Sequence, residues 1–493
     1  MQTLHEMVWG PWTMLLFLGT GLFFTVKSGG FQVRGLPYWW KRTAGSLYAP
    51  RRRDEKRQRR AGGDRQNDSG TDASGRAQVS AFQTSCTALA ATIGTGNIVG
   101  VATALTAGGP GAVFWLWLSA LIGMATAYAE TSLGQKYRYR TPGGMWQCGP
   151  MVSMEQGLGC RSMGVLYALF AVLASLGMGS MVQSNAVSET LCYEAGMQRG
   201  IVAVLVTALT AAVVWGGIRR ISRMTSWFVP LSAGIYFFFS VWVLVVCRRS
   251  IPVMLLQIIK EAWTPGAAGG GITGFFFSRS VRFGLARGVF SNEAGLGTLA
   301  VLHGAAEDTT PEEQGMWAMF EVFFDTIIIC TLTALVILCV GRECGLYADI
   351  GQLGRLASGN AAGADLSLQL QTLDGAALTS FCFTKVLGRF GGILVSASMA
   401  AFAFATIIGW YYIGRQMFAY LAKRLCLGQH VEYLYTIFYL LSVYLGCVCR
   451  LDLVWMLSDV VNGLMAYPNL LTLWILARSV RFPDAGNAAE GNR

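Results

Sequence analysis

The sequence has few charged residues and none of the common catalytic motifs. Asp, Glu, Lys and Arg make up only 13% of its 493 residues, and the three histidines (His5, His303 and His430) are far apart. There is no H-E-x-x-H zinc motif, no Walker A lysine loop and no G-x-S-x-G nucleophile elbow. These absences argue against metallopeptidases, ATP-driven pumps and hydrolases, so any uphill work must draw on an ion gradient. The twelve cysteines are scattered and indicate no metal site.

Long apolar runs dominate the rest of the chain, of which 53% is hydrophobic. Runs of this kind are long enough to cross a bilayer as helices, so we predict an all-α polytopic membrane protein with about eleven transmembrane helices. The first run has no basic region before it and no small-residue cleavage site after it, so we expect residues 1–26 to remain as an N-terminal helix. The predicted spans are 8–26, 82–105, 111–134, 162–189, 200–217, 226–247, 262–278, 314–340, 390–418, 431–449 and 453–476.

The placement of basic residues predicts the orientation, because Lys and Arg collect in cytoplasmic segments. With the N-terminus outside, the inner segments hold 29 of the 38 Lys and Arg residues and the outer segments hold 9. The C-terminal tail, 477–493, is then cytoplasmic. We therefore expect a multi-pass protein of a cell membrane, of the kind found in the bacterial inner membrane.

Residues 27–81 form the longest predicted inner loop, and Arg51 to Gln78 within it is basic, then small and polar. This composition lacks apolar periodicity and predicts disorder. A basic run can bind nucleic acid, but next to a membrane span it is more simply a cytoplasmic loop that contacts anionic lipid. We expect membrane lipid, and no nucleic acid, as its partner.

Two predicted spans carry interruptions. Gly94-Thr95-Gly96-Asn97 breaks the apolar run of 82–105, and Pro265 with the glycine run 269–271 breaks 262–278. In lipid, unwound backbone is tolerated only where protein buries it or where it lines a cavity. Transporters use paired broken helices of this kind to bind solutes and ions near the bilayer midplane. The sequence therefore predicts a small-solute site near residues 92–97.

The chain resembles the alanine/glycine:cation symporters, the sodium:alanine symporter family, over nearly its whole length. The matching segments are long, numerous and in the family's order, so the resemblance is specific. They are TALAATIGTGNIVGVATAL from Thr87, GGPGAVFWLW from Gly108, Met181-Val-Gln183-Ser-Asn185, WGGIRRIS at 215–222, GLARGVFSNEAGLGT at 284–298, EVFFDTIIICTLTALVIL at 321–338, GAALTS at 375–380, FAFATIIGWYY at 402–412 and SDVVNGLMAYPNL at 458–470.

The resemblance implies a LeuT-like fold, in which two five-helix repeats have opposite topology. The first repeat would be 82–247 and the second 262–476, preceded by the extra N-terminal helix. Each repeat would then begin with a span that the residues alone mark as interrupted. The family also implies Na⁺-coupled symport of a small neutral amino acid, with no cofactor, by a protein that we expect to be monomeric.

A zwitterionic amino acid needs donors for its carboxylate and acceptors for its ammonium group. A half-helix N-terminus offers unpaired N–H groups, and carbonyl oxygens are free where a helix unwinds. Glycine allows the backbone to approach the substrate closely. The candidate substrate-binding residues are Thr92, Gly94, Thr95, Gly96, Asn97, Gln183, Gly270, Thr273, Gly274 and Trp410.

The LeuT-like pattern would place one Na⁺ between the first broken helix and the ninth span. The matching ligands are the carbonyl oxygens of Ala90, Ile93 and Phe402 and the hydroxyl of Thr406. The family usually has two adjacent threonines in this stretch, whereas here the first position is Ala405. One hydroxyl ligand is therefore missing, which leaves both Na⁺ and H⁺ open as the coupling ion. Thr406 could alternatively bond only its own helix carbonyl.

Several polar residues within apolar runs could have either a functional or a structural role. Glu130, Glu321 and Asp325 are intramembrane acids, which are functional candidates or structural hydrogen-bonding groups. Gln183 either reaches the substrate or bonds a neighbouring helix, and Trp410 either walls the pocket or packs in the core. The stretch 291–295 falls in a predicted cytoplasmic segment, as an inner gate or a structural turn.

Other substrates and other classes of protein stay open at this point. Serine, glutamine or a D-amino acid could replace alanine or glycine, because pocket size is not readable from sequence. A solute sensor or a channel could keep the same fold. Channels tend to be symmetric oligomers, however, and a single chain with its own internal repeat disfavours that reading. A membrane enzyme would need a nucleophile or a metal cluster, and the sequence has neither.

Overall fold

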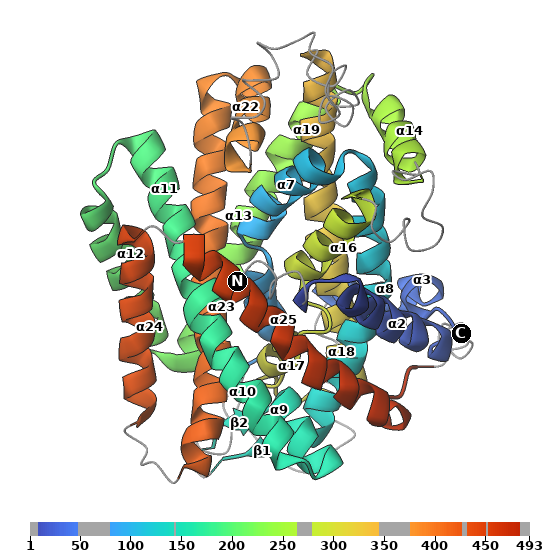
Figure 1. The fold of residues 1–493 in the computed structure, drawn as a ribbon, viewed down its shortest axis with the longest axis vertical. Coiled ribbons are helices and arrows are strands. Elements are labelled where there is room, and N and C mark those ends of the chain that lie inside the picture. Colours follow the sequence, from blue (N-terminus) through green and yellow to red (C-terminus); the bar gives the residue numbers. More distant parts are fainter. Residues whose placement is uncertain are drawn as a thin grey trace, which may run out of the picture.

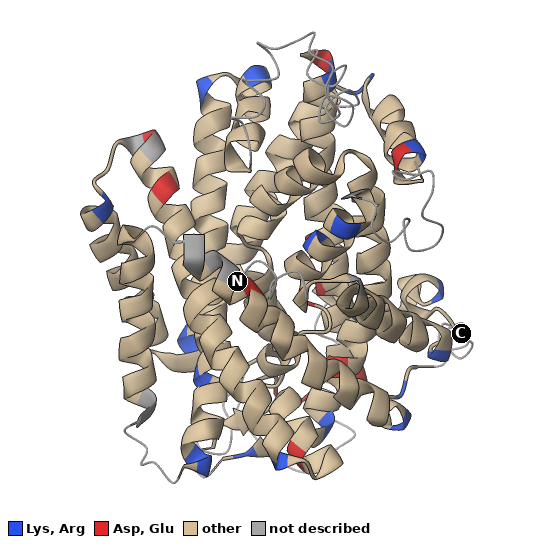
Figure 2. Cartoon of the chain, viewed as in Figure 1, with Lys and Arg blue, Asp and Glu red and all other residues tan. Residues whose placement is uncertain are grey.

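The computed structural model describes residues 8–47, 79–141, 144–263, 279–344, 375–425, 431–449 and 452–483, and these residues are almost entirely helical (Figure 1). Five helices are long and apolar enough to cross a membrane, or six if the bent pair at 81–108 is one span, among the residues described. Figure 2 shows that charged positions are sparse along the long helices. This pattern is that of an integral membrane protein.

The N-terminal half supplies the helices around the first break. Its last three helices pack side by side with the C-terminal helices at one flank of the bundle (Figure 1). The elements are α2 (Pro11–Lys27), α3 (Phe31–Arg34), α4 (Leu36–Arg42), η1 (Ala44–Leu47), α6 (Ala81–Thr92), η2 (Thr95–Asn97), α7 (Val99–Gly108), α8 (Gly111–Tyr137), β1 (Tyr139–Arg140), β2 (Trp146–Gln147), α9 (Pro150–Val152), η3 (Ser153–Gly157), α10 (Arg161–Leu176), η4 (Gly177–Val182), α11 (Gln183–Ala195), α12 (Arg199–Val214) and α13 (Gly217–Val246).

The C-terminal half interleaves with the first and ends in a helix that crosses the front of the bundle (Figure 1). Its elements are α14 (Ile251–Ala262), α16 (Arg279–Asn292), α17 (Thr298–His303), α18 (Pro311–Val322), η5 (Phe323–Cys330), α19 (Thr331–Glu343), α22 (Ala376–Leu387), α23 (Arg389–Arg424), α24 (Val431–Val448), α25 (Asp452–Ile475) and η6 (Ala477–Ser479).

Each predicted span except 262–278 coincides with a helix or a pair of helices in continuation. Residues 264–278 lie outside the described part of the chain, so that span remains a prediction. The segment 279–313, counted as cytoplasmic in the charge analysis, contains two helices that the hydropathy of the sequence did not predict, α16 at 279–292 and α17 at 298–303. The physical reason is that α7 and α8 cover this segment, so it need not be apolar enough to face lipid.

Side chains face two different surroundings. Two large apolar clusters hold the interior, one centred on α8, α10 and α23 and the other on α6, α13 and α19. On the outside, large apolar side chains are exposed, such as Trp215 at 69%, Trp227 at 58% and Phe238 at 56%. A soluble protein rarely leaves so much apolar surface uncovered, so lipid is the expected contact of these side chains.

Small residues let the helices approach closely at the centre. A β-carbon at Gly409 of α23 would lie 2.9 Å from the β-carbon of Ala91 on α6. One at Gly179 of η4 would lie 2.5 Å from the β-carbon of Trp410. Helix association inside lipid relies on such close backbone packing rather than on the hydrophobic effect. These contacts fix α6, η4 and α23 around the first break.

Candidate functional site

The first break separates α6 from α7, whose axes differ by 62°. Ile93 and Gly94 have extended backbone conformations, and the short helix η2 follows them. The side-chain oxygen of Asn97 accepts a hydrogen bond from the Gly94 amide at 3.0 Å, which stabilises the turn. Both Gly94 and Asn97 are buried inside the bundle. The break predicted at residues 94–97 is therefore present in the structure.

The candidate Na⁺ ligands of α6 and α23 come together beside this break. The hydroxyl of Thr406 lies 3.0 Å from the carbonyl oxygen of Phe402 and 3.4 Å from that of Ile93. Ala90 is fully buried in the same cluster, as is Ala405. Because Ile93 ends α6, its carbonyl has left the helix ladder and faces α23. Thr406 therefore bonds its own helix, as the alternative interpretation expects, and it also lies beside the Ile93 carbonyl of α6.

Gln183 lies on the other side of the same break. Its side-chain oxygen accepts a hydrogen bond from the Thr95 hydroxyl at 3.2 Å, and its amide nitrogen donates to the Met178 carbonyl at 3.4 Å. Met178 belongs to η4, a π-helical stretch that ends directly before Gln183. Wide helical turns of this type are frequent at functional sites because they redirect side chains. Gln183 is therefore aimed at η2.

Two further candidates point elsewhere. The hydroxyl of Thr92 bonds the carbonyl oxygens of Ala88 and Leu89 in its own helix, at 3.3 and 3.5 Å. The side chain of Asn185 donates to the carbonyl of Gly446 at 3.1 Å and therefore serves helix packing. Gly270, Thr273 and Gly274 lie outside the described residues.

A second interrupted helix faces the first. α16 and α17 are separated by a turn at 293–297, in which Glu293 adopts a positive φ of 55°. A β-carbon at Gly96 would lie 3.5 Å from the ring of Phe290 and 3.8 Å from the α-carbon of Ser291. The backbone of α16 thus reaches η2 directly. Of the two readings of 291–295, the turn is present, and it is buried among helices.

Glu293 links this turn to Trp410, which is fully buried. The indole N–H of Trp410 donates to one carboxylate oxygen of Glu293 at 3.0 Å, and the Thr298 hydroxyl donates to the other at 2.6 Å. Trp410 therefore holds the second break as well as packing against Gly179. The sequence predicted a turn or an inner gate at 291–295, which includes Glu293, but gave no sign of its bonds to Trp410 and Thr298.

Asp325 ties both breaks together from η5. The Asn97 amide donates to one of its oxygens at 2.6 Å, and the hydroxyls of Ser291 and Thr326 donate to the other at 2.7 and 2.9 Å. Asp325 is fully buried, and its two oxygens accept three hydrogen bonds. These bonds hold the Asp325 side chain between Asn97 of η2 and Ser291 of α16. Its position four residues after Glu321 gave only a general hint of function.

Glu130 of α8 holds the turn of the second break from behind. One of its carboxylate oxygens accepts bonds from the amides of Gly295 and Gly297, both at 3.1 Å, and from the side chain of Asn469 at 3.0 Å. The hydroxyl of Tyr167 donates to the carbonyl of Leu296 at 2.8 Å. These contacts fit the structural reading of Glu130, as the anchor of a glycine-rich turn.

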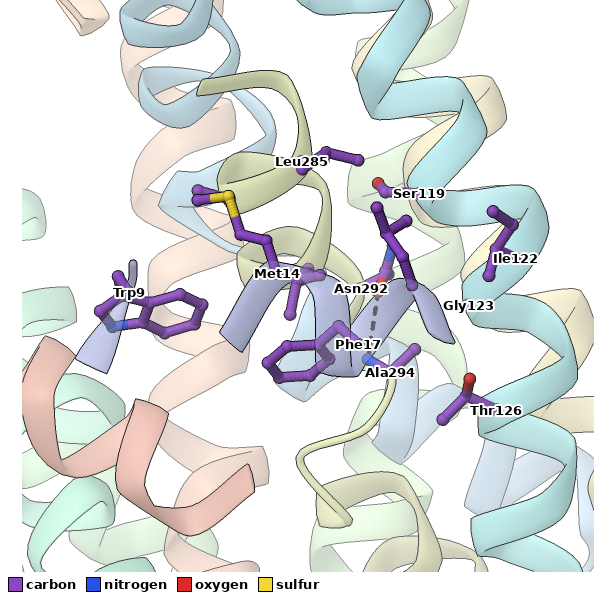
Figure 3. Close-up of a pocket in the computed structure, with 13 residues that line it drawn as sticks. Trp9, Met14, Phe17, Ser119, Ile122, Gly123, Thr126, Leu285, Asn292 and Ala294 are labelled. Carbon is purple, nitrogen blue, oxygen red and sulfur yellow. Dashed lines mark hydrogen bonds between the residues drawn. The ribbon is translucent and has the colours of Figure 1, made fainter. Parts of the chain in front are cut away.

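An apolar pocket lies between α2, α8 and α16, beside the second break (Figure 3). Met14 and Phe17 of α2 and Gly123 of α8 are among the residues that line it, and the amide of Ala294 donates to the Asn292 side chain at its edge. The lining is almost entirely hydrocarbon. It lacks the paired donors and acceptors that a zwitterion needs, so we do not regard it as the substrate site.

Outside the spans, a charged contact closes one end of the bundle. Glu155 of η3 forms ion pairs with Arg424, at the end of α23, and with Arg161, whose nitrogen lies 3.5 Å away. Partial burial raises the pKa of Glu155, but the hydrogen bond and positive charge of Arg424 outweigh it and hold that pKa below 4.5. The carboxylate is therefore ionised at neutral pH.

These contacts define what the site can do. Hydroxyl, amide and carbonyl groups from α6, η2, η4 and α23 converge at the first break. Among the described residues, no group of three or more His, Cys, Asp and Glu side chains is placed to hold a metal ion. Hydroxyl, amide and carbonyl groups of this kind can bind a small polar solute or an alkali cation.

Comparison with known proteins gives matches along the whole chain. The model of the sodium:alanine symporter family matches residues 1–482. An uncharacterized transporter of Haemophilus influenzae is 38% identical over 475 residues, covering 96% of this chain and 92% of that protein. The sodium/alanine symporter AgcS of Methanococcus maripaludis is 36% identical, covering 97% and 94% respectively. A probable sodium/glutamine symporter of Bacillus subtilis, GlnT, is 31% identical, covering 97% and 87%.

Proposed function

Because the chain belongs to the sodium:alanine symporter family, we propose that it carries a small neutral amino acid into the cell together with Na⁺. Alanine and glycine are the proposed substrates, and alternating access to a site between the two breaks is the proposed mechanism. The observation that carries this proposal is the unwound segment at Gly94, where a β-carbon would lie 2.7 Å from the Thr406 hydroxyl and 3.5 Å from the Gln183 side-chain oxygen.

The amino acid is proposed to bind at η2. Its carboxylate would accept from the N–H groups of Thr95 and Gly96, and from that of Asn97 once it releases the Gly94 carbonyl, to which it donates at 3.3 Å. The side-chain oxygen of Gln183 accepts a hydrogen bond from the Thr95 hydroxyl in this structure. In the proposed complex, the same oxygen would accept a hydrogen bond from the ammonium group of the substrate. Trp410, whose indole N–H is hydrogen-bonded to Glu293, would line one side of the site. The close approach of Phe290 to Gly96 favours a small side chain on the substrate.

The coupling ion is proposed to bind between Ile93, Phe402 and Thr406, with the Ala90 carbonyl completing the set. Since Ile93 directly precedes the substrate-binding glycine, the ion and the amino acid would order the same unwound backbone. Ordering by one ligand then lowers the cost of binding the other. This shared segment is the physical basis of symport in our proposal.

We propose the LeuT-like arrangement of two inverted repeats, 82–247 and 262–476. In this proposal the helix pair α16 and α17, with its break at 293–297, replaces 262–278 as the first span of the second repeat. Each repeat then has five spans, and the single N-terminal helix precedes both repeats. The N-terminus then lies outside and the C-terminus in the cytoplasm, with the protein monomeric in a bacterial inner membrane.

The substrate is tested by competition. Proteoliposomes with purified protein take up radiolabelled alanine under an inward Na⁺ gradient while unlabelled glycine, serine, glutamine and D-alanine compete. We expect L-alanine and glycine to compete most strongly. Strong competition by glutamine with weak competition by glycine would instead favour the specificity named for the Bacillus subtilis relative.

A further inference from the structure

A second polar cluster lies apart from the proposed substrate and ion sites. His303, the last residue of α17, packs against Glu321 of α18, and both side chains are fully buried. The Nε2 atom of His303 lies 3.0 Å from each oxygen of the Glu321 carboxylate. A titratable pair inside a membrane protein is a functional candidate, because water cannot stabilise either charge there.

A chain of hydrogen bonds leads from this pair toward the surface. The Nδ1 atom of His303 lies 2.6 Å from the side-chain oxygen of Gln314. The amide nitrogen of Gln314 donates to the hydroxyl of Thr309 at 3.0 Å, and that hydroxyl donates to Glu313 at 3.2 Å. The side chain of Glu313 is 36% exposed. The chain therefore joins a buried pair to an accessible carboxylate.

The polarity of this chain fixes the protons on His303. Because the Gln314 nitrogen faces the Thr309 hydroxyl, its oxygen faces the histidine, so Nδ1 must carry a hydrogen. The Nε2 atom then shares one further proton with Glu321. If that proton is lost, the Nε2 lone pair faces an ionised carboxylate, and the contact between α17 and α18 becomes repulsive.

The neighbouring elements bring few other charges to the pair. Ser85 and Cys86 of α6 face Glu321. At the end of α8, Arg138 donates to the carbonyl oxygens of Gly304 and Ala306, beyond the ring. Among the described residues, including those of α23, the ring of His303 has no ion-pair or hydrogen-bond partner besides Glu321 and Gln314. The presence of one shared proton therefore determines whether Nε2 of His303 and the Glu321 carboxylate attract or repel each other.

We propose that the His303–Glu321 pair is a proton-binding site of the transport cycle, which rests on the proposed function. The proton is held between Nε2 and the carboxylate while α17 packs against α18, and it exchanges with water when the two helices part. The bonds to Gln314, Thr309 and Glu313 keep the hydrogen on Nδ1 in place. Release of the shared proton separates these helices. Because α6 and α17 belong to the two interrupted helices and both contact this region, the release is linked to rearrangement of the breaks.

Proton movement and amino-acid uptake are measured in the same proteoliposomes, with a pH-sensitive dye inside the vesicles and radiolabelled alanine outside. The variants are Glu321→Gln and His303→Gln, which keep hydrogen-bonding groups but cannot exchange this proton. Glu312→Gln is the matched control, since it makes the same change on α18 away from the hydrogen-bonded chain. We expect alanine to drive proton movement in the wild type and the control, and this movement to be lost in both variants.

The outcomes separate the two proposals. Absence of alanine uptake by the wild type would contradict the proposed function, whatever the dye reports. Uptake without any proton movement, or wild-type proton movement in Glu321→Gln and His303→Gln, would overturn the inference about this pair.

Should those variants fail to fold, the wild type still decides the matter. The chain has only three histidines, so ¹⁵N-histidine labelling gives three ring systems, which His5→Gln and His430→Gln assign. We expect the His303 ring to carry hydrogens on both nitrogens in the ligand-free protein, and its Nε2 signal to change when Na⁺ and alanine are added. A ring without a hydrogen on Nδ1, or one that never responds, would refute the proposal.

Discussion

A β-carbon at Gly94 would lie 2.7 Å from the hydroxyl oxygen of Thr406. The backbone that we propose for substrate binding and the side chain that we propose for ion binding are therefore in direct contact. The closeness requires glycine at this position, because the Thr406 hydroxyl also bonds the Phe402 carbonyl and cannot move away freely. Residue 94 is thus the point at which the two proposed sites touch.

The first prediction compares two glycines in this turn. Gly94→Ala overpacks the contact with Thr406, whereas a β-carbon at Gly96 meets Phe290 at an ordinary 3.5 Å. Overpacking costs about 1 to 3 kcal/mol, so Gly94→Ala should reduce initial uptake about fivefold or more, and Gly96→Ala much less. Initial uptake rates, normalised to folded protein, measure this. Equal uptake rates for the two variants would mean that Gly94 is not part of the binding site.

The second prediction concerns the ion ligands on α23. Thr406→Ala removes one ligand, and a loss of about 1 to 1.5 kcal/mol should raise the half-saturating Na⁺ concentration about five- to tenfold. Thr406→Ser keeps the hydroxyl and serves as the control. Ala405→Thr, which restores the family's second threonine, should lower that concentration. The measurement is uptake as a function of Na⁺; unchanged curves for Thr406→Ala and Ala405→Thr would place the ion elsewhere.

The third prediction concerns pH and the Glu155–Arg424 contact. The pKa of Glu155 is held below 4.5, so its stabilising effect is present at neutral pH and is lost as the pH falls through that lowered value. Glu155→Gln should therefore lower the melting temperature of the purified protein at about pH 7, with a cost of about 1 kcal/mol or less, and this deficit should shrink steadily as the pH falls below about 4. A deficit that persists undiminished in acid would mean that lost packing, and not charge, causes it.

The fourth prediction concerns orientation. Single cysteines at Ser69 and Gly359, in a background without accessible cysteines, should react with a membrane-impermeant reagent from opposite sides. The basic loop at 27–81 places Ser69 inside, and the span count places Gly359 outside. Labelling of both from one side would rule out the eleven-span arrangement.

The first break could be predicted from sequence because its signal is local. Gly94, Gly96 and Asn97 interrupt a run that is otherwise apolar, and no regular membrane helix favours them. The contact of Thr406 with Ile93 could not be derived from spacing, since the two residues are 313 positions apart. It was expected only through the family resemblance.

The helix pair at 279–303 was missed for a physical reason. Arg279, Arg282, Asn292 and Glu293 make this segment too polar for a lipid-facing span. The surrounding α7 and α8 bury it, so hydropathy is no guide to its position. The bonds of Glu293 to Trp410 and Thr298 depend on that burial, and no local pattern indicates them.

The most direct test of Na⁺-coupled symport is accumulation of radiolabelled alanine in proteoliposomes that contain only this protein. Three conditions are compared: an inward Na⁺ gradient at equal pH, an inward proton gradient without Na⁺, and no gradient. We predict accumulation above the external concentration with the Na⁺ gradient and only equilibration without a gradient. Equal, non-accumulating uptake in all three conditions would contradict coupled transport, and accumulation under the proton gradient alone would contradict Na⁺ as the coupling ion.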